Sequence, residues 1–113
     1  MILITGGVYQ GKRALADKLA EENPGKMEIL DNCDKKIRQQ LKEGHSPKEI
    51  LELWAHENEE SKILIFNDVS LGIVPIEKEE RIFRETTGQV GVMLAEKADS
   101  VYRVFCGIPK KIK

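Results

Sequence analysis

The sequence predicts an α/β domain built around a parallel sheet, and three observations support that prediction. Short apolar runs alternate with segments of helical periodicity along the chain. A glycine-rich turn joins the first apolar run to the first helical segment. Polar residues with candidate chemistry directly follow the apolar runs, which is where open parallel sheets bind ligands. The chain of 113 residues has the size of one domain, spanning residues 1–113.

Each expected element is bounded by hydrophobic periodicity and by the residues that end it. Strands are expected at residues 1–5, 26–30, 62–66 and 100–106, with a turn at 107–109 and an edge strand at 110–113. Helices are expected at residues 12–22, 34–43, 47–60 and 79–97. Before the third helix, Ser46 and Glu49 have the spacing of a capping box. The helical positions expected to face the core are Leu15, Ala16, Leu19, Ala20, Ile37, Leu41, Ile50, Leu53, Trp54, Ile82, Phe83, Val90 and Leu94.

Composition argues against several classes of function. Charged residues make up 33% of the chain, but the net charge is only −1, so charge gives no reason to expect nucleic acid or a membrane surface as a partner. Cys33 and Cys106 lack the paired spacing of a zinc site or disulfide framework, which favours a reducing, cytoplasmic location. No apolar run reaches the length of a membrane span. His45 and His56 have no carboxylate or nucleophile at a telling spacing and are interpreted as surface residues.

The residues after the first strand, GGVYQGK at positions 6–12, fit the phosphate-loop motif G-x-x-x-x-G-K. In this motif glycines let the backbone curl so that N–H groups point at phosphate oxygens, and the following helix adds a partial positive charge. Lys12 would reach the β- and γ-phosphates. The alternative is a glycine-rich strand-to-helix turn without a ligand. The residues expected to bind the phosphates are Gly6, Gly7, Val8, Tyr9, Gln10, Gly11, Lys12 and Arg13.

Arg13 stands at the eighth position of the motif, where Ser or Thr would supply a hydroxyl to Mg²⁺. A guanidinium has only donors and cannot bind a cation, although it could reach an α-phosphate or the charge that develops on a γ-phosphate. Asp31 follows the strand at residues 26–30 and is the candidate ligand of Mg²⁺, directly or through water. The alternative is that Asp31 and Asn32 turn the chain or cap the next helix.

Asn67 and Asp68 open a long connection, residues 67–75, after the strand at 62–66. Long connections at strand ends often carry ligand contacts, which predicts a binding loop here. Because the carboxyl ends of parallel strands share one edge, the phosphate loop, Asp31 and Asn67–Asp68 are expected to form one nucleotide site. Gly88 and Gly91 weaken the interior of the last helix and could mark a close approach to another helix or to a ligand.

The C-terminal half carries a more specific pattern, with NDVSLGIVP at positions 67–75, FRE at 83–85, LA at 94–95 and GIPKKIK at 107–113. In order and spacing these motifs, together with the first strand and phosphate loop, resemble the adenosylcobinamide kinase / adenosylcobinamide-phosphate guanylyltransferase family. The resemblance implies a three-layer, parallel-sheet, P-loop NTPase-like (recombinase-like) fold, here reduced in size, and assembly as a homo-oligomer. It also implies phosphoryl transfer from ATP or GTP to adenosylcobinamide in cobalamin biosynthesis, with Mg²⁺ as the metal.

By this resemblance Lys12, Asp31 and Asp68 would be catalytic, and Asn67 would line the nucleotide site. The family usually has Glu where Asp68 stands. The middle of this chain is much shorter than the family's and lacks the segment that carries the guanylylated histidine, so guanylyl transfer is expected to be lost. The alternative function is that of a non-catalytic member, which binds nucleotide or corrinoid as a partner subunit.

Overall fold

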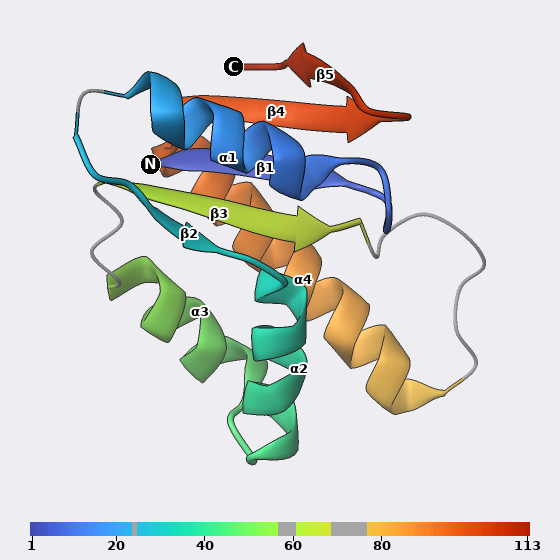
Figure 1. The fold of residues 1–113 in the computed structure, drawn as a ribbon. Coiled ribbons are helices and arrows are strands. Elements are labelled where there is room, and N and C mark those ends of the chain that lie inside the picture. The colour runs from blue at the N-terminus through green and yellow to red at the C-terminus, as the bar shows by residue number, and fades with distance from the viewer. Residues whose placement is uncertain (24, 57–60, 69–76) are drawn as a thin grey trace.

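The computed structural model describes residues 1–23, 25–56, 61–68 and 77–113, and within them the chain forms a five-stranded sheet with helices on both faces (Figure 1). The sheet order is β2-β3-β1-β4-β5. The strands are β1 (Ile2–Gly6), β2 (Glu28–Leu30), β3 (Lys62–Asn67), β4 (Ser100–Phe105) and β5 (Ile108–Lys111). The helices are α1 (Lys12–Glu22), α2 (Cys33–Lys42), α3 (Pro47–His56) and α4 (Lys78–Lys97).

The first four strands are parallel, and the register places their carboxyl ends together. Gly6 at the end of β1 lies beside Asn67 of β3 on one side and Val104 of β4 on the other. Strand β2 pairs with β3 in the same direction, whereas β5 runs antiparallel to β4 at the edge. The phosphate loop that follows β1 therefore begins at the centre of the carboxyl edge, flanked by the ends of two other strands.

The three-layer arrangement divides the core into two clusters. Helix α1 covers one face of the sheet, where Ala16 packs near Ile4 and Ile65. Helices α2, α3 and α4 cover the other face (Figure 1), where Trp54 is 1% exposed and its ring lies 5.8 Å from that of Phe66. This confirms the predicted three-layer α/β fold with a mainly parallel sheet.

Most local predictions agree with the structure. Helix α1 has the predicted bounds, and the capping box before α3 is present, because the Ser46 N–H donates to Glu49 Oε1 and the Glu49 N–H donates to Ser46 Oγ. The prediction that Leu53 faces the core was wrong, because this residue is 48% exposed. His45 also differs from prediction, because its Nδ1 lies 3.5 Å from a carboxylate oxygen of Glu49.

The C-terminal turn is also corrected. It was predicted at residues 107–109, but Ile108 and Pro109 belong to β5, and the chain reverses at Cys106 and Gly107. These two residues have φ angles of 50° and 76°, which is the left-handed conformation that a two-residue hairpin turn requires. The predicted end of the third helix at 57–60 and most of the predicted binding loop, residues 69–75, lie outside the described residues. No helix in the described ranges combines the length and hydropathy needed to cross a membrane.

Candidate functional site

Two glycines give the loop after β1 its shape. A side chain at Gly6 would place its Cβ 2.5 Å from the carbonyl oxygen of Val104, so the loop can leave β1 only because this residue has no side chain. Gly11 has a φ of 93° and directly precedes α1, where it ends the loop in the left-handed conformation. Between them, Tyr9 has a φ of 60° and a fully exposed side chain. The local backbone is therefore the curled loop that the motif predicts.

Two hydrogen bonds join the turn between β4 and β5 to Gln10 of the loop. The Cys106 N–H donates to Gln10 Oε1 at 2.6 Å, and the Gly107 N–H donates to the carbonyl oxygen of Gln10 at 2.9 Å. The backbone of Gly107 also lies close to Gly11, where an added Cβ would be 3.3 Å from the Gly107 Cα. Gln10, an unspecified position of the motif, thus connects the loop to the other end of the chain.

Lys12 is buried beneath the loop, with 6% of its surface exposed. Its ammonium group donates a hydrogen bond to the carbonyl oxygen of Gly7. Burial lowers the pKa of the Lys12 ammonium, and this effect outweighs the nearby carboxylates of Asp31 and Asp34, which raise it. The ammonium has three donors and one of them is used by the loop, so it can also donate to a bound phosphate.

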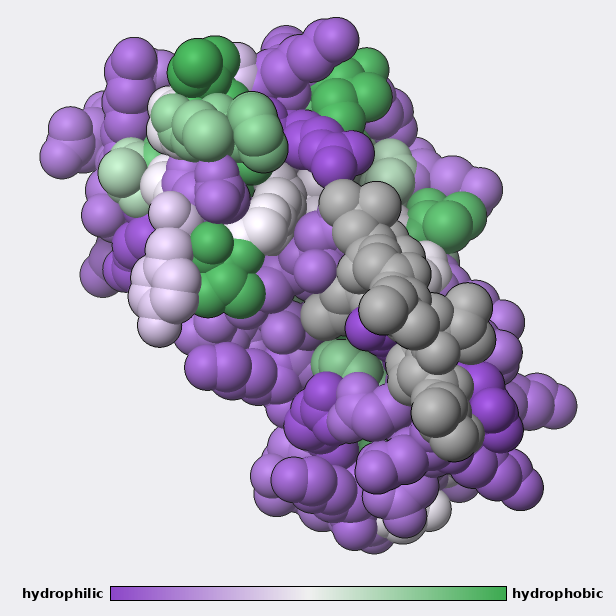
Figure 2. All heavy atoms as spheres, turned by 90° about the vertical axis from the view of Figure 1, so that its right-hand side faces the viewer, coloured by the Kyte–Doolittle hydropathy of each residue, from purple (hydrophilic) through white to green (hydrophobic). Residues whose placement is uncertain are grey.

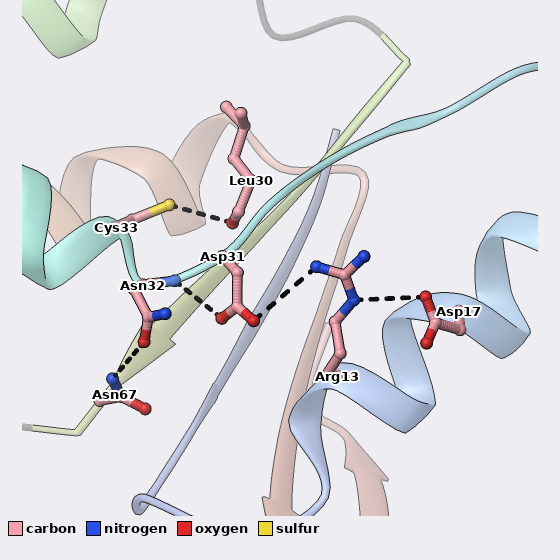
Figure 3. A network of polar contacts seen from close by, with 7 residues as sticks. All are labelled: Arg13, Asp17, Leu30, Asp31, Asn32, Cys33 and Asn67. Atoms are coloured by element: carbon pink, nitrogen blue, oxygen red, sulfur yellow. Dashed lines mark hydrogen bonds and ion pairs between the residues drawn. The ribbon is translucent and has the colours of Figure 1, made fainter.

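Arg13 connects the start of α1 to the end of β2 (Figure 3). Its Nη1 lies 3.8 Å from Asp31 Oδ2, and its Nε lies 3.3 Å from Asp17 Oδ1. The other oxygen of Asp31 accepts the backbone N–H of Asn32 at 2.7 Å. Asp31 does not cap α2, because the N-cap residue is Asn32, which has a left-handed φ of 52°. Both oxygens of the predicted metal ligand therefore already have partners.

The end of β3 is attached to the start of α2 by a network that the sequence analysis missed. The buried carboxylate of Asp34 accepts the backbone N–H of Asn67 at 3.1 Å and its side-chain amide at 3.2 Å. The same amide donates to Asn32 Oδ1 at 3.1 Å (Figure 3). Asp34 thereby fixes Asn67 at the carboxyl edge. In the sequence, an aspartate at position 34, in the first turn of a helix, indicates only that a helix begins there.

A cavity of about 420 Å³ opens between the phosphate loop and the β2–α2 junction. It contains most of the predicted phosphate-binding residues, together with Asp31 and Asn67. Lys35, on the first turns of α2, also lines it and was not predicted. The described lining residues are Val8, Tyr9, Gln10, Gly11, Lys12, Arg13, Ala14, Asp31, Asn32, Lys35 and Asn67. We refer to this as the loop cavity.

Asp68 lines a different cavity, of about 300 Å³, between the sheet and α4. We refer to this as the α4 cavity; its described lining residues are Leu3, Thr5, Phe66, Asn67, Asp68, Thr87, Gly88, Gly91, Val92, Ala95 and Val101. Asn67 lines both cavities. The Asp68 N–H donates to the carbonyl oxygen of Gly6 at 2.8 Å, and Asp68 Oδ2 lies 3.7 Å from Arg103 Nη2. The predicted site residues thus converge on one edge but divide between two neighbouring cavities.

The α4 cavity has two unusual features on its helical side. Among the described residues, nothing outside the local helix backbone lies within 4 Å of a Cβ built on Gly88 or Gly91, so no other described helix packs closely against these glycines. Thr87 is 5% exposed, and its Oγ1 is buried without a hydrogen-bond partner among the described residues. Thr86, one residue earlier, donates its hydroxyl to the Ile82 carbonyl oxygen in the ordinary way. The helix therefore presents small residues and an unsatisfied hydroxyl beside this cavity.

Figure 2 looks onto the carboxyl edge and shows where apolar side chains gather on it. They lie mainly in the upper half of the view, and the lower half is almost entirely hydrophilic. Around the phosphate loop and the β4–β5 turn, the exposed apolar residues are Val8, Tyr9, Phe105 and Ile108.

In the described part of the chain no group of three or more His, Cys, Asp or Glu side chains is arranged to hold a metal ion.

The sheet, its order and the curled loop after the central strand define the class of α/β proteins with a P-loop NTPase-like fold. A family model described as cobinamide kinase / cobinamide phosphate guanyltransferase matches residues 27–112. The chain belongs to this family, which confirms the resemblance found in the sequence. The phosphate loop, residues 6–13, precedes the matched region.

Two curated relatives match over a shorter stretch. The chain is 45% identical over 51 residues to the bifunctional adenosylcobalamin biosynthesis protein CobU of Salmonella typhimurium, and 43% identical over 51 residues to the protein of that name from Escherichia coli. Each match covers 45% of this chain but only 28% of the relative. The roles assigned to individual site residues therefore stay predictions for this chain.

Proposed function

We propose that this chain binds ATP or GTP in the loop cavity and transfers the terminal phosphoryl group to a hydroxyl of adenosylcobinamide. One observation supports this most directly: the loop cavity and the α4 cavity adjoin at Asn67 on the carboxyl edge of the sheet. A phosphotransferase needs a donor site and an acceptor site that meet, because the reacting oxygen and phosphorus must approach in line. The family description supplies the reaction class, since it names a cobinamide kinase.

The loop cavity is suited to the donor. Backbone N–H groups of the curled loop and the start of α1 favour an anion, and Lys12, Arg13 and Lys35 add positive charge. Phosphoryl transfer depends mainly on positioning and on neutralising the charge of the phosphoryl oxygens. The chemistry of the lining thus matches a polyphosphate better than an apolar or cationic ligand.

The α4 cavity is suited to the acceptor. Its described lining is mostly apolar, with Thr5, Asn67, Asp68 and Thr87 as polar groups. The Asp68 carboxylate would accept a hydrogen bond from the acceptor hydroxyl, and the Thr87 hydroxyl would gain a partner. The hydroxyl oxygen would form a bond to the terminal phosphorus, the bond from that phosphorus to the bridging oxygen would break, and Asp68 would receive the hydroxyl proton. A nucleoside diphosphate would leave.

A non-catalytic role is the second candidate. The pairing of Arg13 with Asp31 favours it, because Arg13 stands where a hydroxyl would bind the catalytic metal and its guanidinium faces the carboxylate that would be the other ligand. In that case the chain would hold nucleotide or corrinoid as a partner subunit. We do not propose guanylyl transfer, since the sequence is expected to lack the segment in which the family carries its guanylylated histidine.

The test is an assay of purified chain with radiolabelled ATP or GTP and adenosylcobinamide, followed by separation of the phosphorylated corrinoid. Labelled product from the native chain, abolished in Asp68→Asn and retained in Glu85→Gln on the exposed side of α4, would support the kinase proposal. Nucleotide binding without labelled product would instead support the non-catalytic role. Absence of both would exclude the kinase and a nucleotide-binding partner subunit, and would leave only corrinoid binding to be tested.

A further inference from the structure

The loop cavity has an excess of positive charge. Three cationic side chains among the described residues line it, from Lys12, Arg13 and Lys35, and Asp31 is the single carboxylate. Three positive charges against one negative leave an excess of two positive charges facing the space. A cavity lined by one sign of charge concentrates the opposite sign, here the oxygens of a polyphosphate.

The oxygens near the loop do not fit Mg²⁺. This ion needs near-octahedral oxygen ligands and is ordinarily held by one or two carboxylates together with the nucleotide's phosphates. Asp31 offers one oxygen to the Asn32 N–H at 2.7 Å and the other to Arg13 at 3.8 Å. The Asp34 carboxylate accepts the backbone N–H and the side-chain amide N–H of Asn67. Asp68 lines the other cavity and lies near Arg103.

Arg13 replaces a metal-binding hydroxyl of the motif by a cation. It occupies the motif position where a hydroxyl would bind the metal, and its guanidinium reaches the carboxylate that would be the second ligand. A dication entering this place would have to displace the guanidinium from Asp31 and remain beside its positive charge. The Arg13 side chain is 56% exposed and lines the loop cavity, so the donors that Asp17 and Asp31 leave unused can face a phosphate there.

We propose that this chain binds the polyphosphate of ATP without a divalent cation, and that Arg13, held by Asp31, supplies the positive charge that Mg²⁺ would otherwise supply. This inference rests on the proposed nucleotide site but goes beyond it. Asp31 then acts as a positioning residue for Arg13 rather than as a metal ligand. A planar guanidinium can donate to two phosphate oxygens at once.

The experiment is calorimetric titration of the full chain with ATP, once in excess EDTA and once in excess Mg²⁺. The expected result is an affinity in EDTA that equals or exceeds the affinity in Mg²⁺. Arg13→Ser restores the hydroxyl of the motif; its affinity in EDTA should fall by about tenfold or more, and addition of Mg²⁺ should recover much of that loss. Lys18→Ser removes one positive charge from the same helix outside the cavity and should change neither value by more than about twofold.

Asp31→Asn separates the two roles of Asp31. If Asp31 positions Arg13 rather than a metal ion, this change should alter ATP affinity in EDTA and in Mg²⁺ to the same extent. A selective loss of binding in Mg²⁺ would show that Asp31 is a metal ligand and would overturn the inference. So would native binding that requires Mg²⁺, and the proposed nucleotide site would then still stand. No ATP binding under either condition would overturn the nucleotide site and this inference together.

Discussion

Replacing Lys12 by Met should weaken nucleotide binding while leaving the fold at least as stable. The substitution keeps an apolar chain of similar length in a nearly buried position and removes the ammonium group. A hydrogen bond that involves a charged group contributes about 1.5–3 kcal/mol. At 1.4 kcal/mol per factor of ten, ATP binding should weaken by roughly 10- to 150-fold, which calorimetry can measure directly.

The effect on stability has the opposite sign. Burial lowers the pKa of Lys12 below its ordinary value of 10.5, so the folded chain binds this proton less tightly than the unfolded chain. The buried charge therefore opposes folding at neutral pH, and its cost disappears as the pH rises through the lowered pKa toward 10.5. Over that alkaline window the free energy of unfolding of the native chain should increase relative to that of Lys12→Met, because the variant has no ammonium group to lose a proton.

The matched control is Lys18→Met, which removes an exposed ammonium from the same helix. It should leave ATP binding within about twofold of the native value, because an exposed charge outside the cavity is screened by solvent and salt. The reasoning would be refuted if Lys12→Met bound ATP as tightly as this control. It would also be refuted if Lys12→Met unfolded at a much lower urea concentration, since Lys12 would then be structural.

Three further predictions concern the groups that support the site. Asp34→Asn should lower the free energy of unfolding by about 1–3 kcal/mol, since the buried carboxylate accepts two donors of Asn67; urea denaturation should show a much smaller change for the exposed Asp17→Asn. Trp54→Ala should cost about 3–5 kcal/mol by the same method, followed by circular dichroism, and a loss below about 1 kcal/mol would contradict its place in the core. The hydrogen bond from Arg38 lowers the pKa of the Glu80 carboxyl, so the pair stabilises the fold above the ordinary carboxyl pKa and loses this effect as the pH falls through the lowered one. Glu80→Gln should therefore show a shallower loss of stability in acid, and an unchanged acid limb would show that the pair contributes nothing.

Local chemistry made the secondary structure predictable. Helix α1 begins where a left-handed glycine ends the loop, and α3 begins at a capping box, so both starts are determined by residues within one turn. Periodicity was less accurate about which side of α3 faces inward. Ile50 and Trp54 are fully buried and four residues apart, whereas Leu53 lies at the border of their stripe and is exposed.

The site was less predictable because its contacts join distant parts of the chain. Asp34 is buried only because Asn67, 33 residues later, arrives beside it at the end of β3. Nothing in the neighbourhood of Asp34 in the sequence indicates that contact. Asn67 lines both cavities, whereas Asp68 lines the α4 cavity, and this difference depends likewise on where β3 ends relative to the loop and α4. Sequence reasoning brought these residues to one edge but could not assign them to cavities.

The central position of β1 also affects how the chain folds. This strand precedes both of its neighbours, β3 and β4, in the chain, and the Met1 amino group pairs with Asp99, 98 residues away, at 2.7 Å. Contacts between such distant segments slow folding, because a long loop must close before they form. During synthesis the apolar β1 must therefore stay unpaired with β4 until residues 100–105 have been made. The phosphate loop, which follows β1, thus gains all its contacts only after β4 and the turn that follows it have been made. We therefore expect β1 to be most exposed to chaperones and proteases in chains that stop before β4.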